Sequence, residues 1–281
     1  MTDLARLQKQ FQQRGLTPAV AAGFRELIHA YYDAEGRDFP WRHTRNPYHI
    51  LVSEVMLQQT QVSRVLDKYE PFLAAFPTAE ALAGAAQRDV LAAWQGLGYN
   101  RRALNLQRAA KAITQEHSGT VPDSIEELVK LPGVGHDTAG AIAVLAYNRP
   151  VAYLETNIRA VYQYVFFPGG APGDKELRAL IEGTLDRDDP RRWYFALYDY
   201  GAMLKQKRLA GPVKSRQSKF EGSDRQVRGA VLRALLEQHE LGEDELAEAL
   251  EEPSKRVAKI VRQLSDEGFI TVEDGRVRIR Q

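Results

Sequence analysis

The fold is decided by residues 131–140, which read Leu131-Pro132-Gly133-Val134-Gly135-His136-Asp137-Thr138-Ala139-Gly140. A Gly-Val-Gly turn runs directly into a helix of small residues, so several backbone N–H groups without helical partners meet at one exposed point. Those N–H groups and the positive end of the helix dipole favour a bound phosphate. Both flanking segments, residues 125–130 and 138–147, are apolar and helical in pattern. The stretch predicts a helix-hairpin-helix that grips a DNA backbone without reading bases. The alternative is an ordinary connection between two helices.

Length and composition leave room for two or three compact units. The chain has 281 residues, 44% of them hydrophobic and 27% charged, with a formal net charge of +1. We expect no membrane contact and no export, because no apolar run could span a bilayer and the N-terminus lacks a signal pattern. The chain contains no cysteine. Disulfides, thiolate zinc sites and cysteine-ligated iron–sulfur clusters are therefore excluded.

Positive charge is concentrated locally. One acid-free run carries Lys205, Lys207, Arg208, Lys214, Arg216 and Lys219, and a second basic segment carries Arg101, Arg102 and Arg108. Such runs either contact phosphates or only solvate a surface.

The organisation of the chain changes near residue 207. From about residue 2 to 205, apolar residues recur at helical spacing between Pro and Gly punctuation, which predicts an all-α region of roughly ten helices. Residues 207–223 lack periodicity and mix Gly, Pro, Ser and basic residues, so we expect a basic linker there.

The C-terminal segment, residues 224–281, has a pattern of its own. Three helical stretches precede two β-branched runs, 269–272 and 276–279, that flank Asp274-Gly275, a strong hairpin signal. Three helices followed by a hairpin is the order of a winged-helix-like α/β module. The third helix carries four basic residues, namely Lys255, Arg256, Lys259 and Arg262. They either enter a DNA groove or face solvent on a packing or dimerisation module.

Two acidic residues could carry chemistry. Glu54 lies among apolar residues in Ser53-Glu54-Val55-Met56-Leu57, and burial would raise its pKa into the range of a proton donor. Alternatively, Glu54 faces solvent or pairs with an arginine. Glu155 stands where an extended stretch becomes a helix, and a carboxylate there also suits a simple helix cap.

Several motifs, spread over roughly residues 30–205, occur together in the order and spacing of one family. They are Phe39-Pro40-Trp41-Arg42, Asn46-Pro47-Tyr48, Ser53-Glu54-Val55-Met56-Leu57-Gln58-Gln59-Thr60-Gln61-Val62, Gly96-Leu97-Gly98-Tyr99, Leu131-Pro132-Gly133-Val134-Gly135 and Asn157-Ile158-Arg159. The chain resembles the helix-hairpin-helix DNA glycosylase superfamily, and within it the MutY-like adenine glycosylase and mismatch thymine glycosylase branch.

The resemblance implies a mostly α fold with two helical subdomains. A glycosylase domain over residues 1–206 would comprise a six-helix barrel at about 47–148 and a second subdomain from 1–46 and 149–206. The basic linker, 207–223, and the winged-helix-like module, 224–281, would follow.

The resemblance also implies roles for individual residues. Glu54, Glu155 and Asn157 would be catalytic: Glu54 protonates the purine ring, and Glu155 stabilises the sugar cation or activates water. Gln59 would fill the gap left by the extruded nucleotide, and Tyr99 would insert beside the opposing base.

Further contacts are implied around the hairpin and the basic segments. The expected DNA-binding residues there are Gly133, Val134, Gly135, His136, Thr138, Lys205, Lys207, Arg208, Lys255 and Arg256. The backbone carbonyls of Val129, Leu131 and Val134 would hold a Na or K ion.

Three departures from the family pattern are visible. Glu155 replaces the usual Asp and is longer by one methylene. Asp137 replaces the lysine of bifunctional members, so we expect no Schiff base and no strand cleavage; it either lines the pocket or caps a helix. After Gly201-Ala202-Met203 the family's four-cysteine iron–sulfur loop is missing, as is its usual C-terminal domain.

The sequence therefore predicts a monofunctional DNA glycosylase of base excision repair that flips a damaged or mispaired base and needs no cofactor. Adenine is the expected base. We expect a cytoplasmic, nucleoid-associated monomer that acts on double-stranded DNA containing a lesion or mismatch. One alternative substrate is mismatched thymine or uracil, or a deaminated or alkylated purine. A second alternative is a non-catalytic winged-helix DNA-binding protein.

Overall fold

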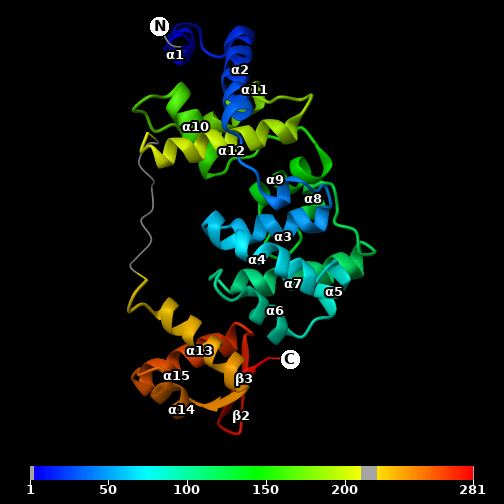
Figure 1. Ribbon diagram of the computed structural model, residues 1–281, viewed down its shortest axis with the longest axis vertical. Helices are drawn as coiled ribbons and strands as arrows, with labels where there is room; N and C mark the ends of the chain where they lie inside the picture. Colours follow the sequence, from blue (N-terminus) through cyan, green and yellow to red (C-terminus); the bar gives the residue numbers. More distant parts are fainter. Residues whose placement is uncertain (1–2, 210–219, 281) are drawn as a thin grey trace. The chain divides into compact units, whose positions relative to one another are not determined.

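The computed structural model describes residues 3–209 and 220–280 (Figure 1). The chain forms two compact units. One contains Met1–Glu54 and Val121–Lys214, and the other contains Val55–Thr120 and Ser215–Gln281. The division of the chain into domains expected from the sequence stays a prediction. Among the described residues, no helix combines the length and apolar character needed to cross a membrane.

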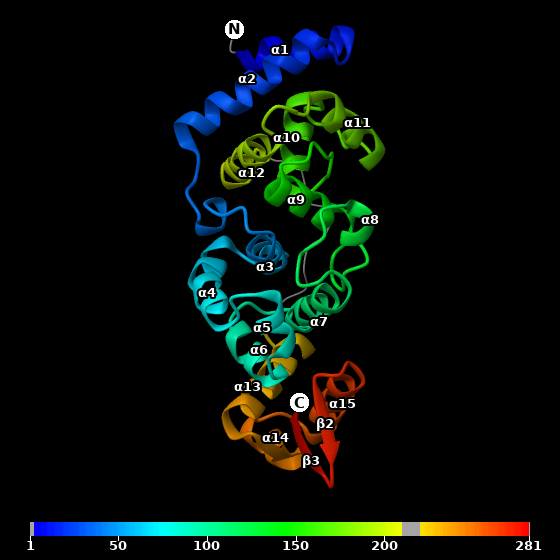
Figure 2. The ribbon, with the colours of Figure 1, turned by 90° about the vertical axis from the view of Figure 1, so that its right-hand side faces the viewer.

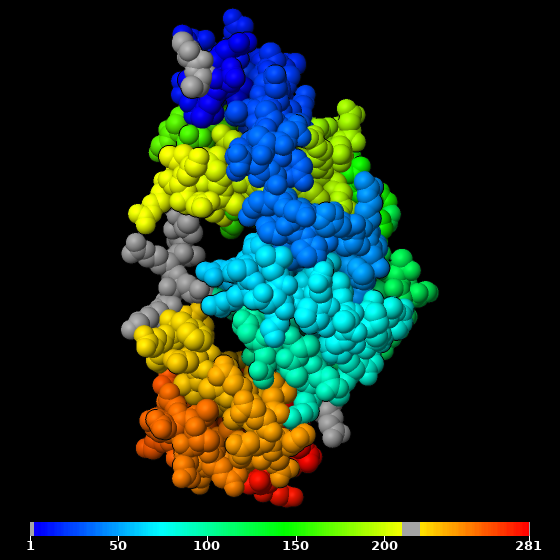
Figure 3. All heavy atoms as spheres, in the orientation of Figure 1, coloured from blue at the N-terminus to red at the C-terminus, as the bar shows by residue number. Residues whose placement is uncertain are grey.

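The first unit is built from helices. In chain order they are α1 (Asp3–Arg14), α2 (Pro18–Glu35), the 3₁₀ turn η1 (Pro40–Arg42), most of α3 (Pro47–Leu57), α8 (Ile125–Leu128), α9 (His136–Tyr147), α10 (Thr156–Phe166), α11 (Asp174–Thr184) and α12 (Pro190–Gln206). Helix α12 packs against α10 on one side and α2 on the other. The space-filling view shows α2, in blue, lying directly on α12, in yellow (Figure 3).

An aromatic cluster fills the core of the first unit. The ring of Phe24 on α2 makes edge-to-face contacts with Tyr162, Phe166 and Trp193, at centroid distances of 4.9 to 5.5 Å. Each such side chain contributes about 2 kcal/mol or more through burial. This cluster fixes α10 and α12 relative to each other, and the candidate active site lies where those two helices meet.

Local sequence signals explain where the helices begin. The side chain of Asp189 accepts a hydrogen bond from the Arg192 N–H, with Pro190 in the first helical turn of α12. Ser124 caps α8 by accepting from the N–H of Glu127. Residues 3–209 contain twelve α-helices where the sequence predicted roughly ten.

Helices α8 and α9 form the predicted helix-hairpin-helix (Figure 2). Gly133 turns the chain with a φ of +83°, and the N–H of Val134 donates to the carbonyl oxygen of Leu131 at 3.1 Å. Gly135 is the N-cap of α9 with an ordinary φ of −88°, so only Gly133 uses the positive φ that glycine permits.

The second unit combines four helices of the middle segment with the C-terminal module. The four are α4 (Val62–Ala75), α5 (Ala79–Gly84), α6 (Gln87–Trp94) and α7 (Arg101–Glu116). The module consists of α13 (Asp224–Gln238), β1 (Glu240–Gly242), α14 (Glu243–Ala249), α15 (Ser254–Asp266), β2 (Ile270–Glu273) and β3 (Arg276–Ile279). Within this unit, Gln87 Nε2 donates to the carbonyl oxygens of Gly268 and Phe269, at 3.1 and 2.9 Å.

The predicted hairpin is present. Strands β2 and β3 pair antiparallel with Ile270 opposite Ile279, and the turn residues Asp274 and Gly275 both have positive φ, as the two-residue Asp-Gly turn requires. Strand β1 adds a third strand, giving the order β1-β3-β2. The sequence did not predict β1, because three residues are too few to show alternation.

Candidate active site

Glu54 lies on α3 among residues that are otherwise buried. The Asn46 side chain accepts from the Tyr48 N–H at 2.9 Å and so starts the helix. Leu51 and Val55 on either side of Glu54 are 0% and 3% exposed, whereas Glu54 itself keeps partial exposure. Burial, and secondly the charge of Glu155, raise the pKa of Glu54 to about 8. Glu54 is therefore mostly a neutral acid at neutral pH, which suits a proton donor.

Glu155 occupies the N-cap position of α10, and its carboxylate is held from two sides. Its Oε1 accepts from the backbone N–H groups of Asn157 and Ile158, at 2.6 and 2.7 Å. Its Oε2 accepts from the side chains of Thr156 at 3.2 Å and Asn157 at 3.3 Å. Burial raises the pKa of Glu155 above its usual value, and these donors together with Lys205 limit the rise. Glu155 thus caps α10, as one of the two alternatives predicted. In this position its charge still interacts with Glu54.

Two tyrosines that sequence reasoning missed lie with this pair of acids. The hydroxyl groups of Tyr153 and Tyr198 are 2.5 Å apart, and the Tyr153 ring stacks on Tyr194 at a centroid distance of 4.1 Å. Burial and then the charges of Glu54 and Glu155 raise the pKa of Tyr198 well above its usual value. Both hydroxyl groups are thus neutral hydrogen-bonding groups next to the carboxylates.

Two glycines permit the close backbone contacts that assemble the site. A Cβ on Gly140 of α9 would lie 2.7 Å from Tyr153 Cβ, and one on Gly201 of α12 would lie 2.4 Å from the Asn157 carbonyl oxygen. Real Cβ atoms do not approach so closely, so both positions require glycine for packing. Gly201 is the glycine of the Gly-Ala-Met motif, so this close contact explains why the motif begins with glycine.

Lys205, predicted to contact DNA, lies beside the candidate active site. Its Nζ is 2.8 Å from Asn157 Oδ1 and 3.0 Å from Thr156 Oγ1. The side chain is partly buried at the end of α12.

Asp137 ties the hairpin to the site. It lies in the first turn of α9, where its Oδ1 accepts from the Leu154 N–H at 3.1 Å and from Arg178 at 2.8 Å. Its carboxylate therefore fixes the residue before Glu155 instead of capping α9, whose N-cap is Gly135.

The Phe-Pro-Trp-Arg motif binds α12 through its arginine. Arg42 forms a bidentate pair with the buried Asp199, with distances of 2.7 and 2.8 Å, and Arg37 adds a further hydrogen bond at 2.7 Å. Burial alone would raise the pKa of Asp199, but these partners lower it. The pair anchors α12 to η1 at a point six residues before Lys205.

In the second unit, Gln59 and Tyr99 share an unusual backbone conformation. Their φ values are +53° and +48°, in the left-handed region that non-glycine residues rarely adopt. Both side chains are exposed, Tyr99 by 39%. Such strain concentrates at functional positions.

Arg102 holds both of these turns, a role that sequence reasoning missed. Its guanidinium donates to the carbonyl oxygens of Val55, Met56 and Gln58 at 2.6 to 2.8 Å and to that of Gly98 at 3.0 Å. Arg102 belongs to a predicted basic segment, yet its charge is used inside the protein. The signal was its place three residues after Tyr99, the last residue of the Gly-Leu-Gly-Tyr motif.

The hairpin presents backbone to solvent. Gly133, Gly135 and His136 are exposed, Thr138 is partly exposed, and Val134 is 5% exposed. Within the described ranges 3–209 and 220–280, no group of three or more His, Asp or Glu residues could hold a metal ion, and the sequence has no cysteine.

The remaining basic residues divide into two kinds. Lys207, Arg208 and Lys255 are exposed, whereas Arg256 is paired with Glu252 at 2.9 Å and Asp224 at 3.1 Å. Most of the predicted basic linker, including Lys214, Arg216 and Lys219, lies outside the described residues.

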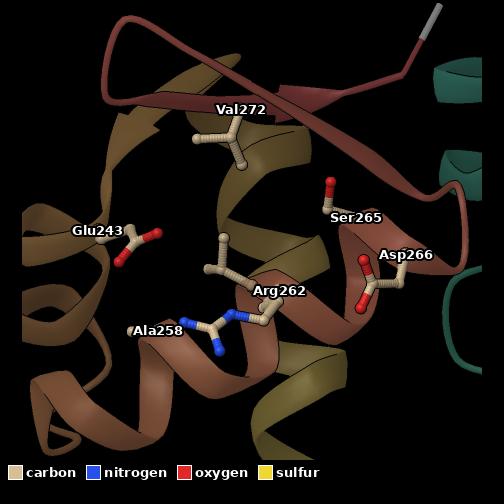
Figure 4. A pocket seen from close by; sticks show the side chains of 7 residues that line it. Glu243, Ala258, Arg262, Ser265, Asp266 and Val272 are labelled. Carbon is tan, nitrogen blue, oxygen red and sulfur yellow. The ribbon is translucent and has the colours of Figure 1, made fainter.

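The C-terminal module contains a small pocket of about 220 Å³. Figure 4 shows Arg262, Ser265 and Asp266 of α15 around it, with Glu243 entering from the start of α14. The charges in its lining are mixed, and the pocket holds none of the predicted site residues.

A helix-hairpin-helix joined to a neutral acid and a second carboxyl group held by four hydrogen bonds is the arrangement of a DNA glycosylase. The chain belongs to the HhH-GPD superfamily of base excision DNA repair proteins, whose sequence model matches residues 52–186. Its relatives include the adenine DNA glycosylase of Mycobacterium tuberculosis, which is 38% identical over 232 residues, covering 73% of this chain and 76% of the relative. The adenine DNA glycosylase of Mycolicibacterium smegmatis is 36% identical, covering 75% of this chain and 79% of that protein.

A solved structure confirms the mostly α fold. A thermostable thymine-DNA glycosylase superposes with a TM-score of 0.62 and 27% identity, covering 69% of this chain and 89% of the other. The predictions of a helix-hairpin-helix fold and of a DNA glycosylase of base excision repair are confirmed.

Proposed function

We propose that the chain excises adenine from duplex DNA containing a damaged or mispaired base. The observation that carries the proposal is the different surroundings of two electrostatically coupled glutamates: Glu54 keeps its proton to about pH 8, and Glu155 accepts four hydrogen bonds. The names of the two mycobacterial relatives favour adenine as the base.

The reaction follows from these two ionisation states. Glu54 transfers its proton to a ring nitrogen of the flipped adenine, so that the electrons of the breaking N-glycosidic bond pass to a neutral leaving base. The Glu155 carboxylate stabilises the positive charge that develops on the sugar, and a water molecule then adds to the sugar carbon and loses its proton to this carboxylate. Asn157 orients Glu155. No step requires an amine, so we infer a monofunctional enzyme.

DNA contacts are proposed for the exposed groups. The hairpin residues Gly133, Gly135, His136 and Thr138 suit a backbone phosphate because their N–H groups lie at the start of α9. Gln59 and Tyr99 suit the gap left by the extruded base. Lys207, Arg208 and Lys255 add positive charge; Arg256 adds less, because two acids already pair with it.

A monovalent cation at the hairpin is also proposed. The Leu131 carbonyl accepts one hydrogen bond, from Val134, and keeps a second lone pair for a Na or K ion together with the carbonyls of Val129 and Val134. The ion would fix the hairpin shape. We further propose a monomer that works in the cytoplasm on the nucleoid.

The decisive experiment is a base-release assay on a panel of duplexes. The panel carries adenine opposite 8-oxoguanine, guanine or cytosine, thymine or uracil opposite guanine, and deaminated or alkylated purines. We expect adenine release by the wild type and none by Glu54→Gln, with duplex binding retained. Release of thymine or uracil alone would support the second candidate, which the thymine-DNA glycosylase likeness favours. No release from any duplex would favour a non-catalytic DNA-binding protein.

A further inference from the structure

Lys205 is placed differently from the rest of its basic run. Lys207 and Arg208 are exposed, whereas Lys205 is partly buried, with its ammonium within hydrogen-bond distance of Asn157 and Thr156. Gly201, one turn earlier on the same helix, lies against the Asn157 backbone so closely that a Cβ would not fit. Helix α12 thus brings this lysine to the start of α10 through a specific packing contact.

The chemistry of the donors fixes the direction of each hydrogen bond. An ammonium group only donates, so Thr156 Oγ1 and Asn157 Oδ1 must both accept from Lys205. The Thr156 hydroxyl then has its one hydrogen free for Glu155 Oε2, at 3.2 Å. With Oδ1 turned to the lysine, the amide nitrogen of Asn157 faces the same carboxylate oxygen, at 3.3 Å. Lys205 therefore reinforces the orientation in which both side chains donate to Glu155.

Without the lysine, each donor loses the second contact that holds its side chain in place, and only Glu155 itself still orients it. The threonine hydroxyl could rotate, and the asparagine amide could turn its oxygen toward the carboxylate, which would repel it. Only the two backbone N–H groups, which bind the other oxygen, Oε1, would still hold Glu155. The carboxylate would lose the support on the Oε2 side.

We propose that Lys205 is a positioning residue for Glu155, because its ammonium group orients the two side-chain donors that fix the carboxylate. The inference rests on the proposed function of Glu155. Lys205 follows the Gly-Ala-Met motif, after which this chain has no cysteine, and it lies where α10 and α12 meet.

Three titratable groups of the described residues act on Glu155 or respond to its charge. Glu54 on α3 and Tyr198 and Lys205 on α12 interact with it electrostatically. Burial raises the pKa of Glu155, and the positive charge of Lys205 lowers it. Removal of that charge would therefore raise the pKa of Glu155, so that Glu155 takes up a proton at a higher pH. The acidic limb of the activity profile, where Glu155 becomes protonated, is therefore the specific readout.

The test compares Lys205→Met, Lys205→Gln and Lys205→Arg in single-turnover release of adenine at saturating duplex, from pH 5 to 9. Lys175→Met is the matched control, since Lys175 is an exposed lysine on α11. We expect Lys205→Met and Lys205→Gln to lose roughly 100-fold in rate constant and to move the acidic limb to higher pH. Lys205→Arg keeps the charge and the donors, so its acidic limb should stay in place.

Several outcomes would overturn the proposal. An unchanged rate in Lys205→Met, or a slower rate with the acidic limb unmoved, means that Lys205 does not act through Glu155. If Lys205→Met does not fold, the comparison of Lys205→Gln with Lys205→Arg decides, and equal movement of their acidic limbs contradicts the proposal. A wild type that releases no adenine refutes the proposed function and this inference together, whereas wild-type activity with an unaffected Lys205→Met refutes only the inference.

Discussion

The replacement of Glu54 by Gln is expected to abolish base release and to stabilise the fold at alkaline pH. Glutamine has almost the same shape but carries no proton to transfer and never ionises. The folded protein holds the Glu54 proton to about pH 8, whereas the unfolded chain releases it near 4.5. The two consequences of the substitution therefore have opposite signs for activity and for stability.

The magnitude follows from that difference in pKa. At about 1.4 kcal/mol for each pH unit, the gap between 4.5 and about 8 amounts to roughly 5 kcal/mol as an upper bound. Because the folded state binds the proton more tightly, wild-type stability falls as the pH rises from about 4.5 to about 8, and the full cost applies above pH 8. Glu54→Gln escapes this cost, so its advantage should be small near pH 4.5 and grow to several kcal/mol by pH 8.5.

The assays are urea unfolding at pH 5, 7 and 8.5 and single-turnover adenine release over the same range. Wild-type release should fall about tenfold for each pH unit above pH 8, as Glu54 loses its proton. The control is Glu26→Gln, at an exposed position on α2, whose effect on stability should not grow with pH.

A constant stability difference between Glu54→Gln and the wild type across the pH range would contradict a raised pKa of Glu54. That result would show that the carboxyl group ionises normally in the folded protein. A rate that stays level up to pH 9.5 would equally remove Glu54 as the proton donor.

Three further predictions follow from the structure. Glu155→Gln should lower the release rate about 10³-fold or more; because the charge of Glu155 helps to raise the pKa of Glu54, it should also shift the alkaline limb, measured in single turnovers, to lower pH. Arg102→Met leaves several carbonyl oxygens without their donor, so urea unfolding should show a loss of about 3 kcal/mol or more; a loss below 1 kcal/mol would contradict the importance of this cage. Borohydride reduction during turnover should trap no covalent DNA complex in the wild type, because Asp137 is bound to Arg178 and offers no amine; a trapped complex would indicate a lysine nucleophile.

The helical framework could be predicted because its signals are local. The Gly-Val-Gly turn, the Ser124 cap and the Asp-Gly hairpin each depend on residues within a few positions of one another. The partial burial of Glu54 also follows from its apolar neighbours on one helix. Interactions between residues that are close in the sequence determine these features, so the sequence is sufficient to predict them.

The rest of the site depends on contacts between distant segments. Lys205 meets Asn157 across 48 positions, and Arg102 meets Val55 across 47. The sequence assigned both cations to basic surface runs, since charge density is visible in a sequence and a partner far along the chain is not. A lysine at the surface and a lysine that orients a carboxylate have the same local signature.

The two glutamates acquire different protonation states from different backbone positions. Glu54 lies within α3, where the helix uses its own N–H groups and burial dominates the pKa of the side chain. Glu155 lies at the N-terminus of α10, where free N–H groups and the positive end of the helix dipole favour the ionised form. When Glu155 is ionised, its charge adds to the burial that raises the pKa of Glu54, so Glu54 is the stronger holder of the proton. One residue type thus supplies both a donor and a stabiliser, and the helix start that separates them is fixed by the contacts of Asp137, Gly201 and Lys205.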